Sequence, residues 1–171
     1  LKKGGVIICP TDTVYGFLAD ATNKKAVEKI YKIKKRPKSK PLPVFVKDIK
    51  MAKEIAKIDK QQETILKKYW PGKYTFVLNR KSGVKLYGQN KKTIAIRIPK
   101  YKFLNSLLKK VNRSLVQTSV NISNQTVMNN ISDIMRTFSK QDILVMNGGN
   151  IKKGKSSKVI DLTQDKIKTL R

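Results

Sequence analysis

The sequence predicts an α/β or α+β fold, because segments with strand character and segments with helix character alternate along the whole 171 residues. The apolar run at residues 6–9 is typical of a buried strand, whereas residues 24–34 repeat their apolar positions with helical spacing. No internal repeat and no linker interrupts this alternation. We therefore expect one domain over residues 1–171, which is an ordinary size for a domain.

Seven short segments have the apolar, β-branched character of strands. Pro10 stops the first of them, because proline cannot donate to the hydrogen-bond ladder of a sheet. A polar region rich in Lys and Gly separates two later segments, as expected for a turn between strands. The expected strands are residues 6–9, 44–46, 74–78, 93–98, 115–118, 143–146 and 159–162.

Five segments repeat apolar residues at helical spacing. Asn23 and Asp48 are placed to cap the first two helices, since short polar side chains accept hydrogen bonds from the free amides of a helix start. The breaker Trp70-Pro71-Gly72 ends the third helix. The apolar positions that mark these helices are Ala26, Val27, Ile30, Tyr31, Ile33, Ile49, Ala52, Ile55, Ala56, Ile65, Leu66, Tyr69, Phe103, Leu104, Leu107, Leu108, Val111, Ile131, Ile134, Met135 and Phe138.

The net charge of +28 is extreme for a chain of this size, and two explanations remain open. Clustered cations neutralise phosphates, so the charge could mark a nucleic-acid-binding protein. Lysine supplies all but six of the 39 cations, however, and Asn and Ile are also plentiful, which indicates the compositional bias of an AT-rich genome. In either case the positive potential would attract ATP or tRNA.

Several classes of site are excluded by what the sequence lacks. Cys9 is the only cysteine, so no intramolecular disulfide can form, and its apolar neighbours predict a buried, inert thiol. With no histidine, neither histidine catalysis nor a His/Cys zinc site is available. No apolar run approaches the ~20 residues that span a membrane, and no signal peptide is evident, so we expect a cytoplasmic protein.

Residues 10–16, Pro-Thr-Asp-Thr-Val-Tyr-Gly, directly follow the first strand, where α/β sheets commonly bind ligands. Thr11 and Thr13 alternate, so in an extended segment both hydroxyls would face one way and could bind a small polar substrate. The alternative is a turn in which Thr11 and Asp12 cap nearby backbone groups.

A cationic loop follows the first helix. Residues 34–42 carry four lysines and Arg36 on a segment that also contains Pro37 and Pro41, and the fixed prolines would hold the charges ready for an anion. Arginine can grip phosphate or carboxylate with two parallel hydrogen bonds, whereas lysine acts as a point charge. The alternative in so Lys-rich a chain is a solvated basic loop.

Two further segments could bind anions or nucleotides. Residues 118–123 alternate hydroxyl and amide side chains at a strand end, which suits nucleotide hydroxyls, phosphate oxygens or backbone capping. Arg97 lies on an otherwise apolar strand and needs a counter-anion if buried. That anion would be either a ligand carboxylate or phosphate, or an internal aspartate. Neither GxxxxGK[ST] nor GxGxxG is present, so any use of ATP requires another architecture.

Together and in this order, these segments resemble the YrdC/TsaC family of threonylcarbamoyl-AMP synthases, in its short single-domain form. The specific part of the resemblance is residues 10–16 joined to Lys34-x-Arg36-Pro37 and residues 40–42. Weaker matches span the rest of the chain, at Gly4-Gly5, Trp70-Pro71-Gly72, Arg97-Ile98-Pro99, Ser119-x-Asn121, Gly148-Gly149, Ser157 and residues 159–162.

The resemblance implies a twisted, open mixed sheet flanked by helices around a basic cavity. It implies synthesis of threonylcarbamoyl-AMP from L-threonine, bicarbonate or CO2, and ATP, with release of pyrophosphate. Mg²⁺ would be carried with ATP, with no metal held by protein residues. A downstream threonylcarbamoyl-transferase complex would use the product to form threonylcarbamoyladenosine at position 37 of tRNA, and direct contact with tRNA or other RNA remains open.

The same resemblance assigns the site residues. Lys34 and Arg36 are the expected catalytic cations. Departures from the family pattern include Val120, Asn124 and Lys158, and also Phe45, which replaces a histidine of longer relatives. The expected ATP-side residues are Lys34, Arg36, Lys40, Thr93, Ser119, Asn121 and Arg171, and the expected threonine-side residues are Thr13, Arg97, Gln117 and Ser157.

Two other functions compete with this one. A non-catalytic module that binds double-stranded RNA or tRNA would explain the charge but not residues 10–16 or Arg97 on its apolar strand. A carbamoyltransferase relative of the same fold is the second alternative, although such relatives usually carry extra domains. Threonine-dependent release of pyrophosphate would distinguish the synthase from both.

Overall fold

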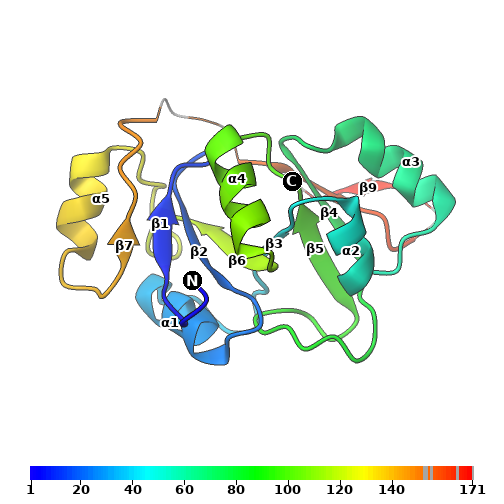
Figure 1. Ribbon diagram of the computed structural model, residues 1–171, viewed down its shortest axis with the longest axis horizontal. Helices are drawn as coiled ribbons and strands as arrows, with labels where there is room; N and C mark the ends of the chain where they lie inside the picture. The colour runs from blue at the N-terminus through cyan, green and yellow to red at the C-terminus, as the bar shows by residue number, and fades with distance from the viewer. Residues whose placement is uncertain (152–153, 155, 165, 171) are drawn as a thin grey trace.

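The computed structural model describes residues 1–151, 154, 156–164 and 166–170, and its centre is one large mixed sheet (Figure 1). Over these residues the sheet has nine strands in the order β7-β1-β2-β6-β3-β5-β4-β8-β9. The mixed sheet flanked by helices confirms the predicted fold class. The strands are β1 Ile7–Cys9, β2 Gly16–Asp20, β3 Val44–Phe45, β4 Tyr74–Asn79, β5 Thr93–Arg97, β6 Leu115–Ser119, β7 Leu144–Val145, β8 Lys158–Asp161 and β9 Lys168–Thr169.

The pairing of the strands brings distant segments of the chain together. The pairs β1–β7, β3–β5 and β4–β8 are parallel, and the remaining neighbours are antiparallel. Strand β2 pairs with β6 over its full length, with Gly16 opposite Ser119. Strand β3 lies between β5 and β6, with Phe45 opposite Arg97 on one side and Leu115 on the other. Across β3, the end of β5 therefore lies level with the start of β6, while the end of β6 lies beside the start of β2.

Four of the five described helices begin at a polar residue whose side chain caps them, whereas the fourth begins after Tyr101, which makes no capping hydrogen bond. Asn23 accepts a hydrogen bond from the Ala26 amide at 3.0 Å, and Asp48 accepts one from Met51 at 2.7 Å, which confirms both predicted N-caps. Asp59 and Gln62 form a capping box at the third helix that the sequence analysis did not identify. The helices are α1 Lys24–Lys34, α2 Ile49–Ile55, α3 Lys60–Tyr69, α4 Lys102–Val111 and α5 Ile131–Phe138.

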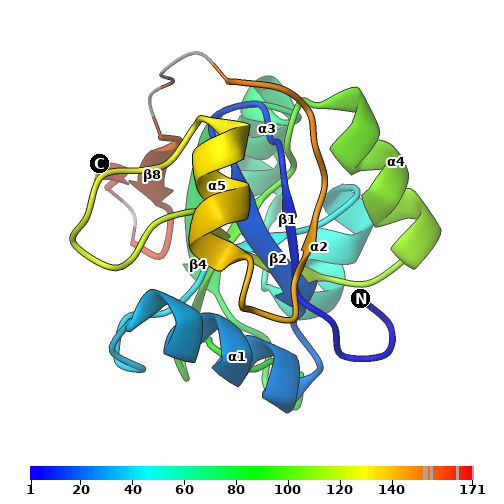
Figure 2. The same ribbon diagram turned by 90° about the vertical axis from the view of Figure 1, so that its left-hand side faces the viewer.

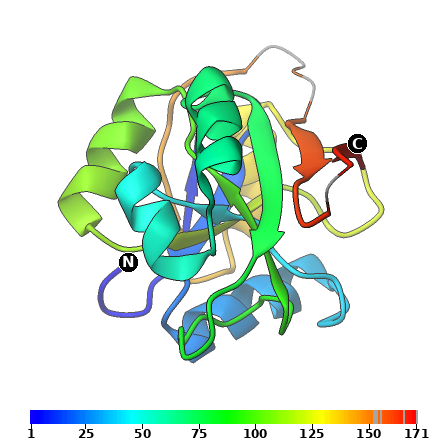
Figure 3. The same cartoon turned by 90° about the vertical axis from the view of Figure 1, so that its right-hand side faces the viewer.

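The sheet buries apolar side chains on both faces. Ile7 and Cys9 of β1 pack in a smaller cluster with Leu104 and Leu108 of α4, whereas Ile8 points into the larger cluster on the other face. This alternation follows from the two-residue period of a strand. Helix α4 and strand β8 lie on opposite sides of the molecule (Figure 2). Figure 3, from the other end, shows the same separation, with α4 and the C-terminal segment at opposite edges of the view.

Cys9 confirms the prediction of a buried thiol, since none of its surface is exposed. Burial raises the pKa of this thiol to about 12, because the thiolate would lose its hydration inside the protein. The thiol therefore stays protonated at neutral pH. No helix in the described part of the chain is both long and apolar enough to cross a bilayer.

Two strands were absent from the sequence-based prediction. Strand β2 follows the 10–15 loop directly, and all five of its residues are buried, so it shows no alternation of apolar and polar residues. Strand β9 is only two residues long and exposed, and its pairing to β8 is a tertiary feature. Prediction from hydrophobic periodicity detects neither a fully buried strand nor a two-residue exposed strand well.

We predict that Leu104→Ala, which removes a fully buried side chain between α4 and the sheet, lowers the free energy of unfolding by about 2–5 kcal/mol. The matched control is Leu144→Ala on the edge strand β7, where Leu144 is 64% exposed, and its cost should be about 0.5 kcal/mol. Urea unfolding of both variants measures the difference. Equal losses in the two variants would contradict the assignment of α4 to the core.

Candidate functional site

A cavity of about 290 Å³ opens where the 10–15 loop, the ends of β5 and β6, and the start of β8 meet. Its volume is near the lower end of the range for small-molecule sites, roughly 300–1,000 Å³. Six of the residues expected from sequence line it, namely Thr13, Arg36, Arg97, Gln117, Ser119 and Ser157. The other described lining residues are Val14, Pro41, Pro43, Thr118, Ser156, Val159 and Leu170.

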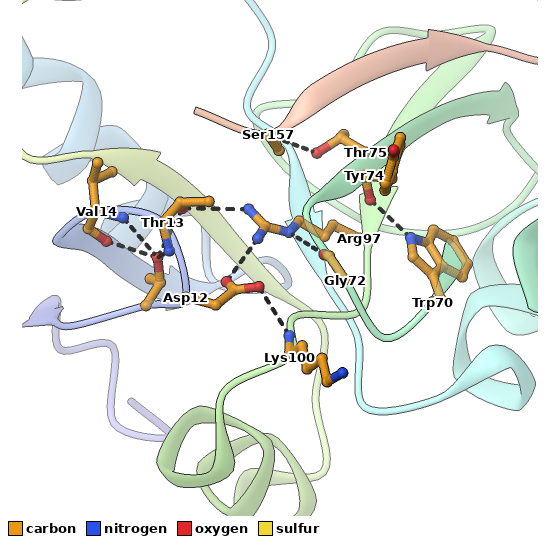
Figure 4. A network of polar contacts seen from close by, with 11 residues as sticks. Asp12, Thr13, Val14, Trp70, Gly72, Tyr74, Thr75, Arg97, Lys100 and Ser157 are labelled. Atoms are coloured by element: carbon orange, nitrogen blue, oxygen red, sulfur yellow. Dashed lines mark hydrogen bonds and ion pairs between the residues drawn. The ribbon is translucent and has the colours of Figure 1, made fainter. Parts of the chain in front are cut away.

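Arg97 is held by a network of fixed acceptors (Figure 4). Its Nη2 donates to Asp12 Oδ1 at 2.7 Å and its Nε donates to the Gly72 carbonyl at 2.9 Å. The two charged side chains are only 2% and 6% exposed, so this is a buried ion pair. Of the two counter-anions left open by the sequence, the structure therefore contains the internal one, Asp12. The guanidinium also lines the cavity.

Asp12 is the functional residue that sequence reasoning missed as a partner of Arg97. Its second carboxylate oxygen, Oδ2, accepts from the Lys100 amide at 3.0 Å, so one side chain ties the 10–15 loop to the segment that follows β5. A signal was available, because the chain has only 11 acidic residues and one of them stands inside the most specific motif. Because Asp12 and Arg97 are far apart in the sequence, local patterns did not indicate that they form an ion pair.

Phe45, the residue that replaces a histidine of longer relatives, lies beneath the same arginine. Its ring is fully buried, and the guanidinium carbon of Arg97 lies 5.6 Å from the ring centre. Such a contact is favourable because the face of an aromatic ring is electron-rich. In this chain, position 45 supports Arg97 by packing.

The other predicted threonine-side residues reach the cavity from three directions. Thr13 Oγ1 lies 3.5 Å from Arg97 Nη1, and Ser157 shares a buried hydrogen bond of 2.9 Å with Thr75. Gln117 packs against Gly16 on the neighbouring strand, where a Cβ would lie 2.9 Å from its Nε2. Glycine at position 16 therefore leaves room for the Gln117 side chain.

Lys34 lies beneath the loop at residues 119–121 and is not among the described residues that line the cavity. Its Nζ donates to the carbonyls of Ser119 at 2.6 Å and Asn121 at 2.8 Å, and to Asn121 Oδ1 at 2.8 Å. These three acceptors match the three N–H groups of an ammonium. Lys34 therefore fastens the end of α1 to the strand-end loop.

Asn121 is also bound within this loop. Its Oδ1 accepts from Lys34 and from Ser119 Oγ, and its Nδ2 donates to the carbonyls of Ile122 and Gln125 at 2.9 and 2.8 Å. The whole amide group is thereby occupied by neighbours. Of the predicted pair, Ser119 lines the cavity and Asn121 shapes the loop that carries it.

The loop after α1 folds around Arg36. Its Nε donates to the Lys40 carbonyl at 3.0 Å, and its Nη2 donates to the Pro41 carbonyl at 2.9 Å. Arg36 lines the cavity, whereas Lys40 contributes a backbone oxygen and its residue is exposed. The loop thus presents one pre-positioned guanidinium to the cavity, in agreement with a constrained loop and not with a fully solvated one.

Two predicted ATP-side residues are not part of this geometry. Thr93 shares a face of β5 with Arg97 but begins the strand, about 13 Å away at roughly 3.3 Å per residue. It does not belong to the described cavity lining. Arg171 lies outside the described residues.

A glycine pair predicted from the resemblance contacts the 10–15 loop from the other end of the chain. The Tyr15 hydroxyl donates to the Gly149 carbonyl at 2.7 Å and accepts from the Gly148 amide at 3.0 Å. Position 148 must be small, because a Cβ there would lie 2.6 Å from Pro10 Cγ. Both glycines therefore support the loop that carries Thr13.

The cavity offers hydroxyl and amide oxygens but, among its described lining residues, no carboxylate. Nor does the described part of the chain contain a group of three His, Cys, Asp or Glu residues that could hold a metal ion. Magnesium prefers carboxylate and phosphate oxygens. The donor set therefore fits a magnesium ion that arrives bound to phosphates better than one caged by the protein.

We predict that Asp12→Asn lowers the free energy of unfolding by about 3–5 kcal/mol, because it leaves the buried guanidinium of Arg97 without its charged partner. Asp133→Asn is the matched control, since its ion pair with Arg136 is exposed and should contribute about 1 kcal/mol or less. Chemical denaturation of both variants tests this. If Asp12→Asn lowered the free energy of unfolding as little as the control does, the buried ion pair would contribute no more to stability than an exposed one.

Lys34 generates a prediction about pH. Burial, and secondarily the charge of Arg36, lower the pKa of Lys34 to about 8, below its ordinary 10.5. Between these two pH values the unfolded chain binds a proton at this site that the folded chain has released, so this group makes folding more favourable as pH rises. The stability of the wild type relative to Lys34→Met should therefore increase from pH 8 to pH 10. A difference that is constant with pH would refute the lowered pKa.

Comparison with known proteins gives a consistent family assignment. The family model Sua5/YciO/YrdC, described as "Telomere recombination", matches residues 1–171. A Neisseria gonorrhoeae protein named threonylcarbamoyl-AMP synthase is 32% identical over 165 residues, which are 94% of this chain and 86% of that protein.

Two solved structures have the same fold over nearly all of the chain. One is Sua5 of Pyrococcus abyssi complexed with L-threonine, which is 30% identical with a TM-score of 0.90. The match covers 99% of this chain but 51% of that one, so the present chain spans about half of its length. The other is Escherichia coli YciO, which is 28% identical with a TM-score of 0.89 over 99% of this chain and 84% of YciO.

Proposed function

This chain belongs to the Sua5/YciO/YrdC family, and we propose that it synthesises threonylcarbamoyl-AMP from L-threonine, bicarbonate or CO2, and ATP, releasing pyrophosphate. The observation that carries the proposal is the arrangement of the cavity. Arg97 and Thr13, the expected amino-acid side, line the same space as Arg36 and Ser119, the expected nucleotide side. One small cavity thus suits an amino acid next to a phosphate.

The amino acid would bind between Arg97 and Ser157. A carboxylate is the natural ligand of a guanidinium that Asp12 and the Gly72 carbonyl already hold in place. Preorganisation lowers the entropic cost of binding, because the side chain has few conformations left to lose. Since the cavity of about 290 Å³ is small, the nucleotide would extend from it past Arg36 and Ser119.

The chemistry would proceed in two steps. The neutral amine of threonine attacks the carbon of CO2, and loss of one proton leaves a carbamate. A carbamate oxygen then attacks the α-phosphorus of ATP, the bond from that phosphorus to the bridging oxygen breaks, and pyrophosphate leaves. Such a reaction requires orientation and neutralisation of phosphate charge more than a strong protein base. This fits a histidine-free chain with Arg36 at the cavity.

The contacts described above refine the proposed roles. Arg36 and Ser119 would touch ATP, which enters as its magnesium complex. Lys34 and Asn121 would instead act by holding the Ser119 loop, because their polar groups are bound within it. A nucleotide role for Lys40, Thr93 and Arg171 rests on the family resemblance.

The product would feed a downstream threonylcarbamoyl-transferase complex that modifies adenosine 37 of tRNA. The net charge of +28 would attract tRNA to this chain without a specific site. In that case RNA retention should weaken steeply with salt, while chemistry inside the cavity should be screened less. The threonine-bound relative supports the amino-acid substrate in particular.

The proposed reaction is tested by incubating the protein with MgATP, bicarbonate and each amino acid in turn, then measuring pyrophosphate. The synthase releases pyrophosphate only with threonine and yields a threonylcarbamoyl adenylate detectable by mass spectrometry. An RNA-binding module releases none. In a parallel incubation with carbamoyl phosphate in place of the amino acid, release of pyrophosphate that does not require threonine would identify a carbamoyltransferase relative.

We predict that Arg36→Ala lowers the rate of adenylate formation by about 10²–10³, because it removes one preorganised charge at the transition state. Lys38→Ala is the matched control, since Lys38 lies on the same loop and its ion pair with Glu28 is exposed. Its rate should stay within about twofold of the wild type. Near-normal turnover of Arg36→Ala at saturating ATP would show that Arg36 does not stabilise the transition state.

A further inference from the structure

The start of β4 lies between the two strands that carry opposite sides of the proposed amino-acid site. In the sheet, β4 has β5 on one side and β8 on the other. It runs antiparallel to β5 and parallel to β8, so its first residues lie beside the end of β5, which carries Arg97, and beside the start of β8, which follows Ser157. Only Lys73 separates β4 from the turn Trp70-Pro71-Gly72.

This segment is fastened to the end of β5 at Gly72. The Gly72 amide donates to the Ile98 carbonyl at 2.9 Å, and the Gly72 carbonyl accepts from Arg97 Nε at 2.9 Å. Position 72 must lack a side chain, because a Cβ would lie 2.5 Å from the Tyr69 carbonyl oxygen. The glycine therefore allows the turn to bring a backbone oxygen to the arginine.

The same segment is fastened to the start of β8 through Lys73 and Thr75. The Lys73 carbonyl accepts from the Lys158 amide at 3.0 Å. The hydroxyls of Thr75 and Ser157 share a hydrogen bond of 2.9 Å (Figure 4). Ser157 lines the cavity, whereas Thr75 is only 2% exposed and does not belong to the described lining. An effect of the Thr75 hydroxyl on a ligand would therefore pass through Ser157.

A hydrogen bond of the Trp70 indole closes the turn. Its Nε1 donates to the Tyr74 carbonyl at 2.9 Å, which ties residue 70 to the first residue of β4 (Figure 4). The indole is buried and packs edge-on against the Phe76 ring, with 5.5 Å between the ring centres. A buried indole N–H requires an acceptor, and this one holds Gly72 in a set position relative to β4.

We propose that Thr75 is a positioning residue that orients the Ser157 hydroxyl toward the amino-acid substrate. The turn at residues 70–74 does the same for Arg97, so one segment sets both sides of the site relative to each other. This rests on the proposed function and deepens it, because threonine would bind between Arg97 and Ser157. Either direction of the hydrogen bond between the two hydroxyls would hold the Ser157 side chain in one rotamer.

The effect should be confined to the amino-acid side. Without the Thr75 hydroxyl, the Ser157 side chain would gain rotamers, and ordering them again on binding costs affinity. On the nucleotide side, Arg36 is held by carbonyls of its own loop, and the Ser119 carbonyl is held by Lys34. Those contacts do not involve β4, so MgATP binding should be little changed.

The test is calorimetric titration of the wild type, Thr75→Val, Ser157→Ala and the double variant with L-threonine and with MgATP. Thr75→Val keeps the shape of the side chain but loses the hydroxyl. We expect its threonine affinity to fall roughly threefold to tenfold, the value of one hydrogen bond, with MgATP affinity within about twofold. Added to Ser157→Ala, the same change should alter threonine affinity by less than about twofold, because its route to the ligand is already gone.

Two further variants complete the set. Thr75→Ser retains the hydroxyl and is the matched control, so it should bind both ligands within about twofold of the wild type. Trp70→Phe keeps an aromatic ring but has no N–H for the Tyr74 carbonyl. It should weaken threonine binding and leave MgATP affinity within about twofold, and it tests the segment even if Thr75→Val does not fold.

Unchanged threonine affinity in Thr75→Val overturns the inference, and so does its full loss recurring on top of Ser157→Ala. Equal losses for threonine and MgATP overturn it too, since residue 75 would then only support the fold. A loss in Thr75→Ser as large as in Thr75→Val has the same meaning. If Thr75→Val does not fold, unchanged threonine affinity in Trp70→Phe decides against the inference. A wild type that binds no threonine contradicts the proposed function itself.

Discussion

The buried ion pair between Arg97 and Asp12 is the contact on which the rest of the cavity depends. It joins the end of β5 to the loop after β1, two segments 85 residues apart in the chain. Burying either charge alone would be costly in free energy, so each of the two residues requires the other as its neighbour. The Gly72 and Lys100 backbone groups and the Phe45 ring complete the surroundings of the pair. A ligand carboxylate would meet a guanidinium whose orientation is already set.

A second buried cation organises the opposite wall. Lys34 fastens the 119–121 loop to α1 through three oxygens, two of them backbone carbonyls. Its pKa is nevertheless lowered to about 8, because burial outweighs what the neutral oxygens provide. In a chain with 39 cationic residues, burial therefore distinguishes the cations that organise the cavity from those that lie in solvent. Lys34 and Arg97 are the two fully buried cations of the described chain, and both act on segments that line the cavity.

Much of the secondary structure could be predicted from local patterns. Asn23 and Asp48 cap helices because the chemistry of capping is local, and the α4 stripe of Leu104 and Leu108 faces the sheet as its spacing requires. Strand β2 was missed because it is buried on every residue and so lacks alternation. The hydrogen-bond partners of Lys34 and Asn121 could not be predicted from local patterns either, because they lie on a segment distant in the sequence or depend on the fold of the loop.

By itself, the sequence determined the fold class, the family and six of the thirteen described residues that line the cavity, because residue type and order carry that information. Thr13, Arg36, Arg97, Gln117, Ser119 and Ser157 come from five separate segments, yet each was identified from a family motif or, for Gln117, from its place beside one. Only the tertiary structure decided which partner each polar group has. Pairings such as Asp12 with Arg97, or Lys34 with the Ser119 carbonyl, depend on which strands lie side by side and on which groups lose their water. Those partners decide whether a side chain faces the cavity or holds its wall in place.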